Sequence, residues 1–199
     1  MVSAVEVVHD FGIIHRDLKP CNFLIVQGVI KLIDFGIAND ISSDVTRYLI
    51  FNSKMVFIAI NSLTTDMVGT LNYMAPEQLL ETEEGSRSAK VGKWADTWSL
   101  GCILYLMAYR KLPFATFKNA HMKIAKITDE QYQIDFPRHN CLGLEAILKQ
   151  CLRHHPKERP LPSEILSGFF FSDDLCELLK FISDEDMRRV YKQVQRLTQ

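Results

Sequence analysis

Two short β-type runs sit almost back to back near the start of the chain, at residues 23–26 (FLIV) and 29–33 (VIKLI). Only Gln27 and Gly28 separate them, and a two-residue connection ending in glycine is typical of a tight β-hairpin. A hairpin folds its two ends together. We therefore expect the polar segments that flank it, residues 15–22 and 34–36, to emerge side by side.

Those flanking segments read HRDLKPCN before the hairpin and DFG after it. Asn22 and Asp34 offer hard oxygen ligands, which suit Mg²⁺ that is held partly by phosphates. Asp17 lies five positions before Asn22 and can face another group, such as an incoming hydroxyl. Lys19 adds a point charge for a phosphoryl oxygen. The pattern predicts a site for phosphate chemistry.

Each motif alone has a simpler interpretation. An isolated loop aspartate usually forms an Asx turn, and a single DFG tripeptide carries little information. The combination of the two strings around one hairpin is far more specific. A metal-dependent hydrolase built on Asp17 and Asp34 is disfavoured, because the extra carboxylates and histidines that such sites need are missing.

The rest of the chain predicts a mainly α fold. Residues 93–109 are apolar on nearly every side from Trp98 onward, which is typical of a buried helix. Residues 39–71 lose periodicity and predict a long loop. Further helices are expected at residues 1–11, 142–152 and 163–167, and in the amphipathic tail, where Ser183 and Asp186 resemble a capping box.

Composition excludes several classes of protein. The 199 residues suffice for one domain, and a formal net charge of −1 argues against nucleic-acid binding. The N-terminus has no basic region of the signal-peptide type, and the longest apolar stretch, residues 100–109, is about half of a membrane span. The five cysteines form no CxxC pair and predict reduced thiols: Cys21, Cys102, Cys141, Cys151 and Cys176.

Together with Met74-Ala75-Pro76-Glu77, these motifs resemble the catalytic loop, metal loop and APE signatures of eukaryotic protein kinases. The resemblance covers residues 1–170 as the C-terminal lobe of the kinase fold, with residues 34–77 as the activation segment. It implies ATP and Mg²⁺ as cofactors and protein hydroxyls as acceptors. It also implies that Asp17 is the catalytic base.

The resemblance extends to other residues. Lys19 would assist catalysis, and together with Gly69-Thr70 it looks like the serine/threonine-specific version. Asn22 and Asp34 would hold the metal ions. The remaining implied roles are an apolar floor under adenine (Leu24, Ile33), a structural ion pair (Glu77, Arg159) and a buried clamp on the catalytic loop (Asp96).

A closer resemblance is to the monopolar spindle kinase family, carried by the strings NFLIV, KLIDFGIAN, VGTLNYM and WSLGCILY. It implies dual specificity, a role in the mitotic spindle checkpoint, and kinetochore or checkpoint proteins as substrates. It also implies that the protein is located in the cytoplasm or nucleus, and at the kinetochore and spindle during mitosis. Neither nucleic acid nor membrane is implied as a partner, and the sequence does not indicate an oligomeric state.

The 199 residues contain neither a GxGxxG loop nor a VAIK-like lysine. A working kinase needs both, so we expect the C-terminal lobe only, with the N-terminal lobe missing and this polypeptide inactive or nearly so by itself. The alternative is a non-catalytic lobe that binds substrates or partners, through a surface around residues 114–126.

Arg16 also departs from the closer family, which usually has a small polar residue there. An arginine beside the base can hold a phosphorylated activation loop. The candidate phosphoacceptors are Thr64, Thr65 and Thr70, followed by Ser42, Ser43 and Thr46. Residue 70 would also contact Asp17 and Lys19.

Two segments lie outside the family pattern. The apolar stretch at residues 48–63 lengthens the activation segment, either as translated intron or as a true lineage insertion. Residues 171–199 form a helical extension that either packs on the lobe or docks on a partner.

Overall fold

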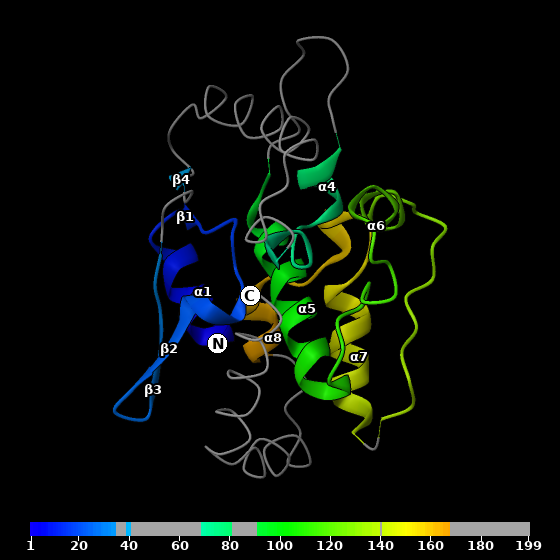
Figure 1. Ribbon diagram of the computed structural model, residues 1–199. Coiled ribbons are helices and arrows are strands. Elements are labelled where there is room, and N and C mark those ends of the chain that lie inside the picture. Colours follow the sequence, from blue (N-terminus) through cyan, green and yellow to red (C-terminus); the bar gives the residue numbers. More distant parts are fainter. Residues whose placement is uncertain (35–38, 41–68, 81–90, 140, 168–199) are drawn as a thin grey trace.

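A computed structural model describes residues 1–34, 39–40, 69–80, 91–139 and 141–167 (Figure 1). These residues form a mainly α structure with two small antiparallel ladders, in agreement with the predicted fold class. The elements in chain order are α1 (Val2–Asp10), β1 (Ile13–Ile14), the 3₁₀ turn η1 (Pro20–Asn22), β2 (Phe23–Val26), β3 (Val29–Leu32), β4 (Asn39–Asp40), α4 (Pro76–Leu79), α5 (Lys93–Tyr109), α6 (Ala120–Ile127), α7 (Leu142–Cys151), the 3₁₀ turn η2 (Pro156–Glu158) and α8 (Pro162–Ser167).

Helix α5 is the centre of the structure. Its residues from Ala95 to Ile103 are all buried, so the helix shows no polar face to solvent. It packs against α7 on one side, while α1 packs on α8 and on the other side of α5 (Figure 1). The helix ends at Arg110, whose φ of 57° is the left-handed conformation typical of a helix C-terminus.

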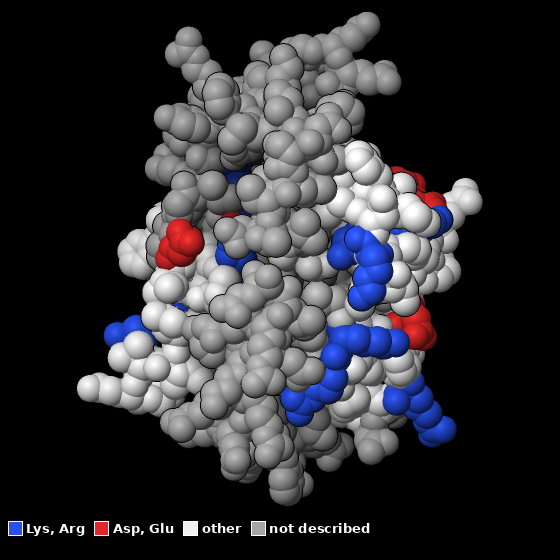
Figure 2. Space-filling model, in the orientation of Figure 1, with Lys and Arg blue, Asp and Glu red and all other residues white. Residues whose placement is uncertain are grey.

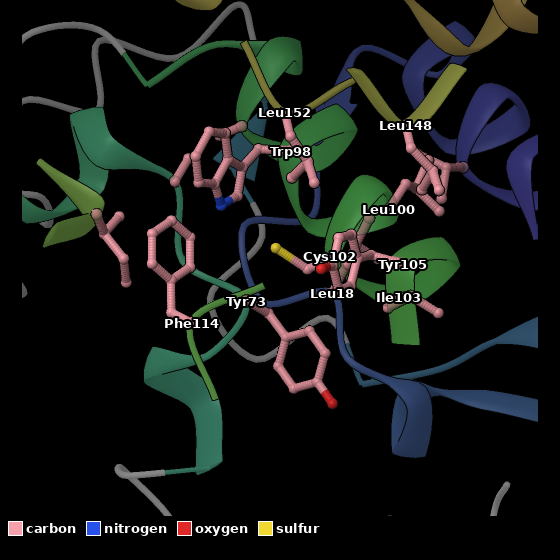
Figure 3. Close-up of a cluster of buried hydrophobic side chains, with 14 of the residues drawn as sticks. Leu18, Tyr73, Trp98, Leu100, Cys102, Ile103, Tyr105, Phe114, Leu148 and Leu152 are labelled. Carbon is pink, nitrogen blue, oxygen red and sulfur yellow. The ribbon is translucent and has the colours of Figure 1, made fainter. Parts of the chain in front are cut away.

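The core joins α5 to the polar segments that carry the predicted site. Trp98 of α5 stacks on Phe114 with ring centroids 6.3 Å apart. Leu18, from the HRDLKPCN segment, and Tyr73, from the chain before α4, are buried in the same cluster as Cys102 of α5 (Figure 3). Packing therefore fixes both segments to one rigid helix.

The hairpin forms as predicted. Its ladder runs from the pair Phe23 and Leu32 at the open end to Val26 and Val29 at the turn. Gln27 and Gly28 have φ values of 52° and 78°, the left-handed pair that a type I′ turn requires. The second strand ends one residue earlier than the predicted run, which included Ile33.

A second ladder was not predicted. β4 pairs with β1 in the register Ile13 to Asp40 and Ile14 to Asn39, so the expected loop at residues 39–71 begins with a short strand. At the far end of that stretch, residues 69–71 are helical. The expected loop was wrong at both ends, because a two-residue strand and a single helical turn are too short to show local periodicity.

The helices predicted at residues 93–109, 142–152 and 163–167 are confirmed, with boundaries within one residue.

Several predictions concern residues that lie outside the described part of the chain. They are the apolar stretch at residues 48–63, Thr64, Thr65, the three earlier hydroxyl candidates and the extension 171–199. Within the described part, no helix is both long and apolar enough to cross a membrane. Figure 2 shows several Lys and Arg side chains, with acidic ones nearby, on the side that carries α6 and α7.

Candidate active site

Asp96 of α5 anchors the loop that follows β1. Its Oδ1 accepts a hydrogen bond from the backbone N–H of Arg16 at 2.7 Å, and its Oδ2 accepts one from His15 N–H at 2.9 Å. His9 Nε2 lies 2.8 Å from the same Oδ2. Asp96 is fully buried, which rules out a surface N-cap. The contacts support Arg16 in its left-handed conformation (φ 69°), which a non-glycine residue seldom adopts without such help.

Asp17 and Lys19 lie side by side just beyond this anchor. Lys19 Nζ donates to Asp17 Oδ2 at 2.8 Å and to Thr70 Oγ1 at 3.4 Å. Burial alone would lower the pKa of Lys19, but the hydrogen bond to Asp17 and its charge outweigh burial, and the pKa is raised. The ammonium group therefore stays charged at neutral pH and bridges the loop to Thr70, a contact that the resemblance implied.

Asn22 is held in a fixed orientation. Its side-chain Nδ2 donates to the Asp17 carbonyl at 3.2 Å, and its Oδ1 accepts from Cys21 Sγ at 3.2 Å. Its backbone carbonyl accepts from Ile33 N–H at 2.8 Å. That last bond joins the start of the hairpin to the residue that precedes Asp34.

Asp34 completes the group of oxygen-bearing side chains. It follows Ile33, whose carbonyl lies 3.2 Å from His15 Nε2, so both ends of the hairpin are tied to the same loop. Burial has the largest influence on both groups, lowering the pKa of Lys19 and raising that of Cys21, and the nearby charge of Asp34 adds a smaller upward shift to each pKa. The hairpin therefore returns the chain to the loop that carries residues 17, 19 and 22, and Asp34 directly follows the residue that is bonded to that loop.

The two residues expected under adenine differ in exposure. Leu24 is half-buried on β2, and Ile33, directly before Asp34, is 38% exposed. Both therefore leave apolar surface open to solvent beside the polar group.

Glu77 and Arg159 form the predicted ion pair. The guanidinium binds the carboxylate in a bidentate manner, at 2.7 Å and 2.9 Å. Arg159 is 2% exposed, lies over the Trp98 ring at 4.9 Å, and donates to three backbone carbonyls, those of Trp94, Arg153 and His154. This pair docks α4 onto the chain between α7 and α8.

Sequence reasoning missed Gln78. Its Nε2 donates to the Arg16 carbonyl at 2.9 Å, and its Oε1 accepts from Ala75 N–H at 2.8 Å. The amide therefore links the chain before α4 to the loop that carries Asp17. A glutamine in a short helix gives no pattern from which this contact could have been found.

Lys123 of α6 is a second contact that the sequence did not indicate. It is buried, and its Nζ donates to Asn72 Oδ1 at 2.5 Å. Burial lowers the pKa of Lys123. The surface predicted around residues 114–126 is thus joined to the segment that holds Thr70.

Comparison with known proteins gives consistent matches. A family model described as "Protein kinase domain" matches residues 1–171. The chain is 45% identical over 167 residues to "Dual specificity protein kinase Ttk" of Danio rerio, which covers 83% of the chain and 16% of that protein. It is 42% identical over 172 residues to "Probable serine/threonine-protein kinase mps1" of Dictyostelium discoideum, covering 85% and 16%.

A third relative is "Serine/threonine-protein kinase mph1" of Schizosaccharomyces pombe, 42% identical over 193 residues, covering 95% of the chain and 24% of that protein. The chain therefore spans between about a sixth and a quarter of the length of these curated relatives.

Proposed function

Because the chain belongs to the protein kinase family, we propose that it transfers the γ-phosphoryl group of ATP to serine, threonine or tyrosine hydroxyls of proteins. One observation carries the proposal: Lys19 Nζ binds Asp17 Oδ2 and Thr70 Oγ1 in a loop whose backbone is held by the buried Asp96. Phosphoryl transfer is catalysed mainly by positioning and electrostatics, which this arrangement supplies.

Asp17 is the proposed base, because its carboxylate sits in the loop beside a lysine that stays charged. Lys19 holds that carboxylate and adds positive charge for the phosphoryl oxygens. Thr70 is positioned by the same ammonium group. Arg16, half-buried and bonded to Asp96 through its backbone, is the proposed partner of a phosphorylated Thr64, Thr65 or Thr70 in the activation segment.

The residues present fit magnesium and a nucleotide. The amide nitrogen of Asn22 points to the Asp17 carbonyl, so Oδ1, which accepts from Cys21 Sγ, is the atom that would bind a metal ion together with the Asp34 carboxylate. Bound Mg²⁺ would neutralise phosphate charge. Leu24 and Ile33 offer apolar surface for the adenine ring. Asp96 supports the site through the backbone of His15 and Arg16, and the pair of Glu77 and Arg159 supports the fold around it.

The finer assignment follows the similar proteins. Their names describe dual-specificity and serine/threonine kinases. We assign the chain to the monopolar spindle group of kinases, with a role in the mitotic spindle checkpoint and chromosome segregation. Kinetochore and checkpoint proteins are the proposed substrates, and cytoplasm or nucleus, with kinetochore and spindle in mitosis, is the proposed location.

The test is a single-turnover assay with purified residues 1–199 in excess, radiolabelled ATP, Mg²⁺ and a mixed Ser/Thr/Tyr peptide. We expect slow transfer, because these residues include no glycine-rich loop and no VAIK-like lysine. Asp17→Asn should reduce that transfer by about 10²- to 10⁴-fold.

Asp135→Asn is the matched control, since Asp135 is an exposed carboxylate far along the chain from the site and should leave the rate unchanged. Transfer that is insensitive to Asp17→Asn would contradict the kinase proposal and favour a partner-binding lobe. Rapid multiple turnover would contradict only the expected slowness of this polypeptide.

A further inference from the structure

Three metal-binding side chains meet away from the proposed active site. His154 and His155 lie between α7 and η2, and Glu130 lies just beyond α6. One ligand atom from each of the three lies within 4.8 Å of the others. Nothing in the proposed phosphoryl transfer uses this cluster.

The two ring nitrogens of His154 differ in their surroundings. Its Nδ1 lies 3.8 Å from Glu130 Oε1, which is longer than a hydrogen bond. Its Nε2 is buried and makes no hydrogen bond to any residue in the described part of the chain. Nδ1 is the nitrogen that faces Glu130, so it is the atom through which His154 would bind a metal ion shared with Glu130.

The backbone on both sides of the cluster is already fixed. The buried Arg159 donates from Nη2 to the His154 carbonyl at 2.7 Å, and Glu158 N–H donates to the His155 carbonyl at 3.1 Å. Glu130 sits in a turn closed by a bond from Tyr132 N–H to the Asp129 carbonyl at 3.0 Å. The three ligands are thus presented by segments that need no metal to hold their shape.

The basic side chains that line the cavity beside the cluster, Lys126, Lys149 and Arg153, each lie near a carboxylate. Lys126 pairs with Asp129 at 2.8 Å, and Arg153 lies 3.7 Å from Glu158. Glu130 and His154 also line a cavity of about 500 Å³, together with Trp98, Phe114 and other residues. That cavity gives room for a water molecule as a fourth ligand.

We propose that Glu130, His154 and His155 form a binding site for Zn²⁺ that joins the turn after α6 to the loop after α7. Two imidazoles and one carboxylate are a donor set that suits zinc, whereas magnesium and calcium prefer oxygen alone. Tetrahedral ligands about 2.1 Å from zinc lie about 3.4 Å apart, close to the 3.8 Å between His154 Nδ1 and Glu130 Oε1. Glu130 and His155 are exposed and free to close the remaining gap by rotation.

The experiment is a calorimetric titration of the 199-residue chain with Zn²⁺. Cys21→Ser and Cys176→Ser are included to remove binding by thiols, since Cys21 is exposed. We expect one zinc ion per chain. In that background, Glu130→Gln and His155→Gln should each weaken binding at least tenfold.

The matched control is His121→Gln, since His121 is an exposed histidine on α6, outside the cluster. It should bind zinc with unchanged affinity. All three altered side chains are exposed, so the variants keep the fold. The proposal is overturned if the background chain takes up no zinc in a saturable way, or if Glu130→Gln and His155→Gln bind as tightly as His121→Gln.

Discussion

At the scale of single residues, the carboxylate of Asp96 holds the proposed catalytic loop in place. An asparagine at position 96 keeps the shape of the side chain but removes its negative charge. It also replaces one carboxylate oxygen with an NH₂ group, which would face an N–H group that needs an acceptor. Since Asp96 is fully buried and bonded to His9, His15 and Arg16, we expect Asp96→Asn to lower the free energy of unfolding by about 2–4 kcal/mol. Urea denaturation followed by circular dichroism measures this.

Asp135→Asn is the control for that measurement. Asp135 pairs with Lys111 at 3.2 Å, but its side chain is 75% exposed, and exposed pairs contribute about 1 kcal/mol or less. An equal, small loss in both variants would show that Asp96 does not anchor the loop.

Sequence motifs predicted Asp96 but not its partner His9, nor Gln78. The His9 contact spans 87 positions, and the Gln78 contact to Arg16 spans 62. Neither residue belongs to a spaced motif, and each finds its partner only once α1, α4 and α5 have packed. The same holds for Glu130 and His154, which approach only because the turn after α6 and the loop after α7 converge.

At the scale of elements, the crossing of α5 and α7 depends on Gly101. Alanine normally favours a helix over glycine by about 0.5–1 kcal/mol. A Cβ at position 101, however, would lie 2.8 Å from Cys151 Cβ and 3.0 Å from Leu152 Cδ2. Because the Cys151 Cβ cannot move without α7, we expect Gly101→Ala to destabilise the protein by about 1–3 kcal/mol in a thermal or urea melt.

The sign of this change is diagnostic. Ala108→Gly, a replacement in the opposite direction near the end of the same helix, gives the ordinary cost of glycine for comparison. A gain in stability from Gly101→Ala would mean that the two helices separate easily and that their contact is not tight.

Local pattern was enough to predict the larger elements. The all-round apolar stretch after Trp98 indicated that α5 is a buried helix, and the Gln27-Gly28 pair indicated the turn of the hairpin. β1 and β4 are different, since two-residue strands have too few side chains to show alternation. Their pairing is decided by where the ends of the hairpin lead the chain.

At the scale of the whole molecule, a buried thiol makes stability depend on pH. Burial raises the pKa of Cys151 from 9.0 to about 12. Below pH 9 the thiol keeps its proton in both the folded and the unfolded chain, so it has no effect on stability. Between pH 9 and 12 only the unfolded chain releases the proton. Each pH unit in that window therefore favours unfolding by about 1.4 kcal/mol through this one group.

Cys151→Ala removes this dependence, although losing the sulfur also lowers stability at every pH. We therefore expect the free energy of unfolding to fall less steeply from pH 9 upward in Cys151→Ala than in the parent chain. Urea titration under reducing conditions measures this.

Ile147→Val is the control, because Ile147 lies in the same buried cluster and lacks an ionisable group. It should shift the curve by about 0.5–1.5 kcal/mol at every pH and leave its slope unchanged. If the free energy of unfolding had the same pH dependence in all three proteins, the Cys151 thiol would titrate alike in the folded and unfolded chains. The contact between α5 and α7 would then be open to water.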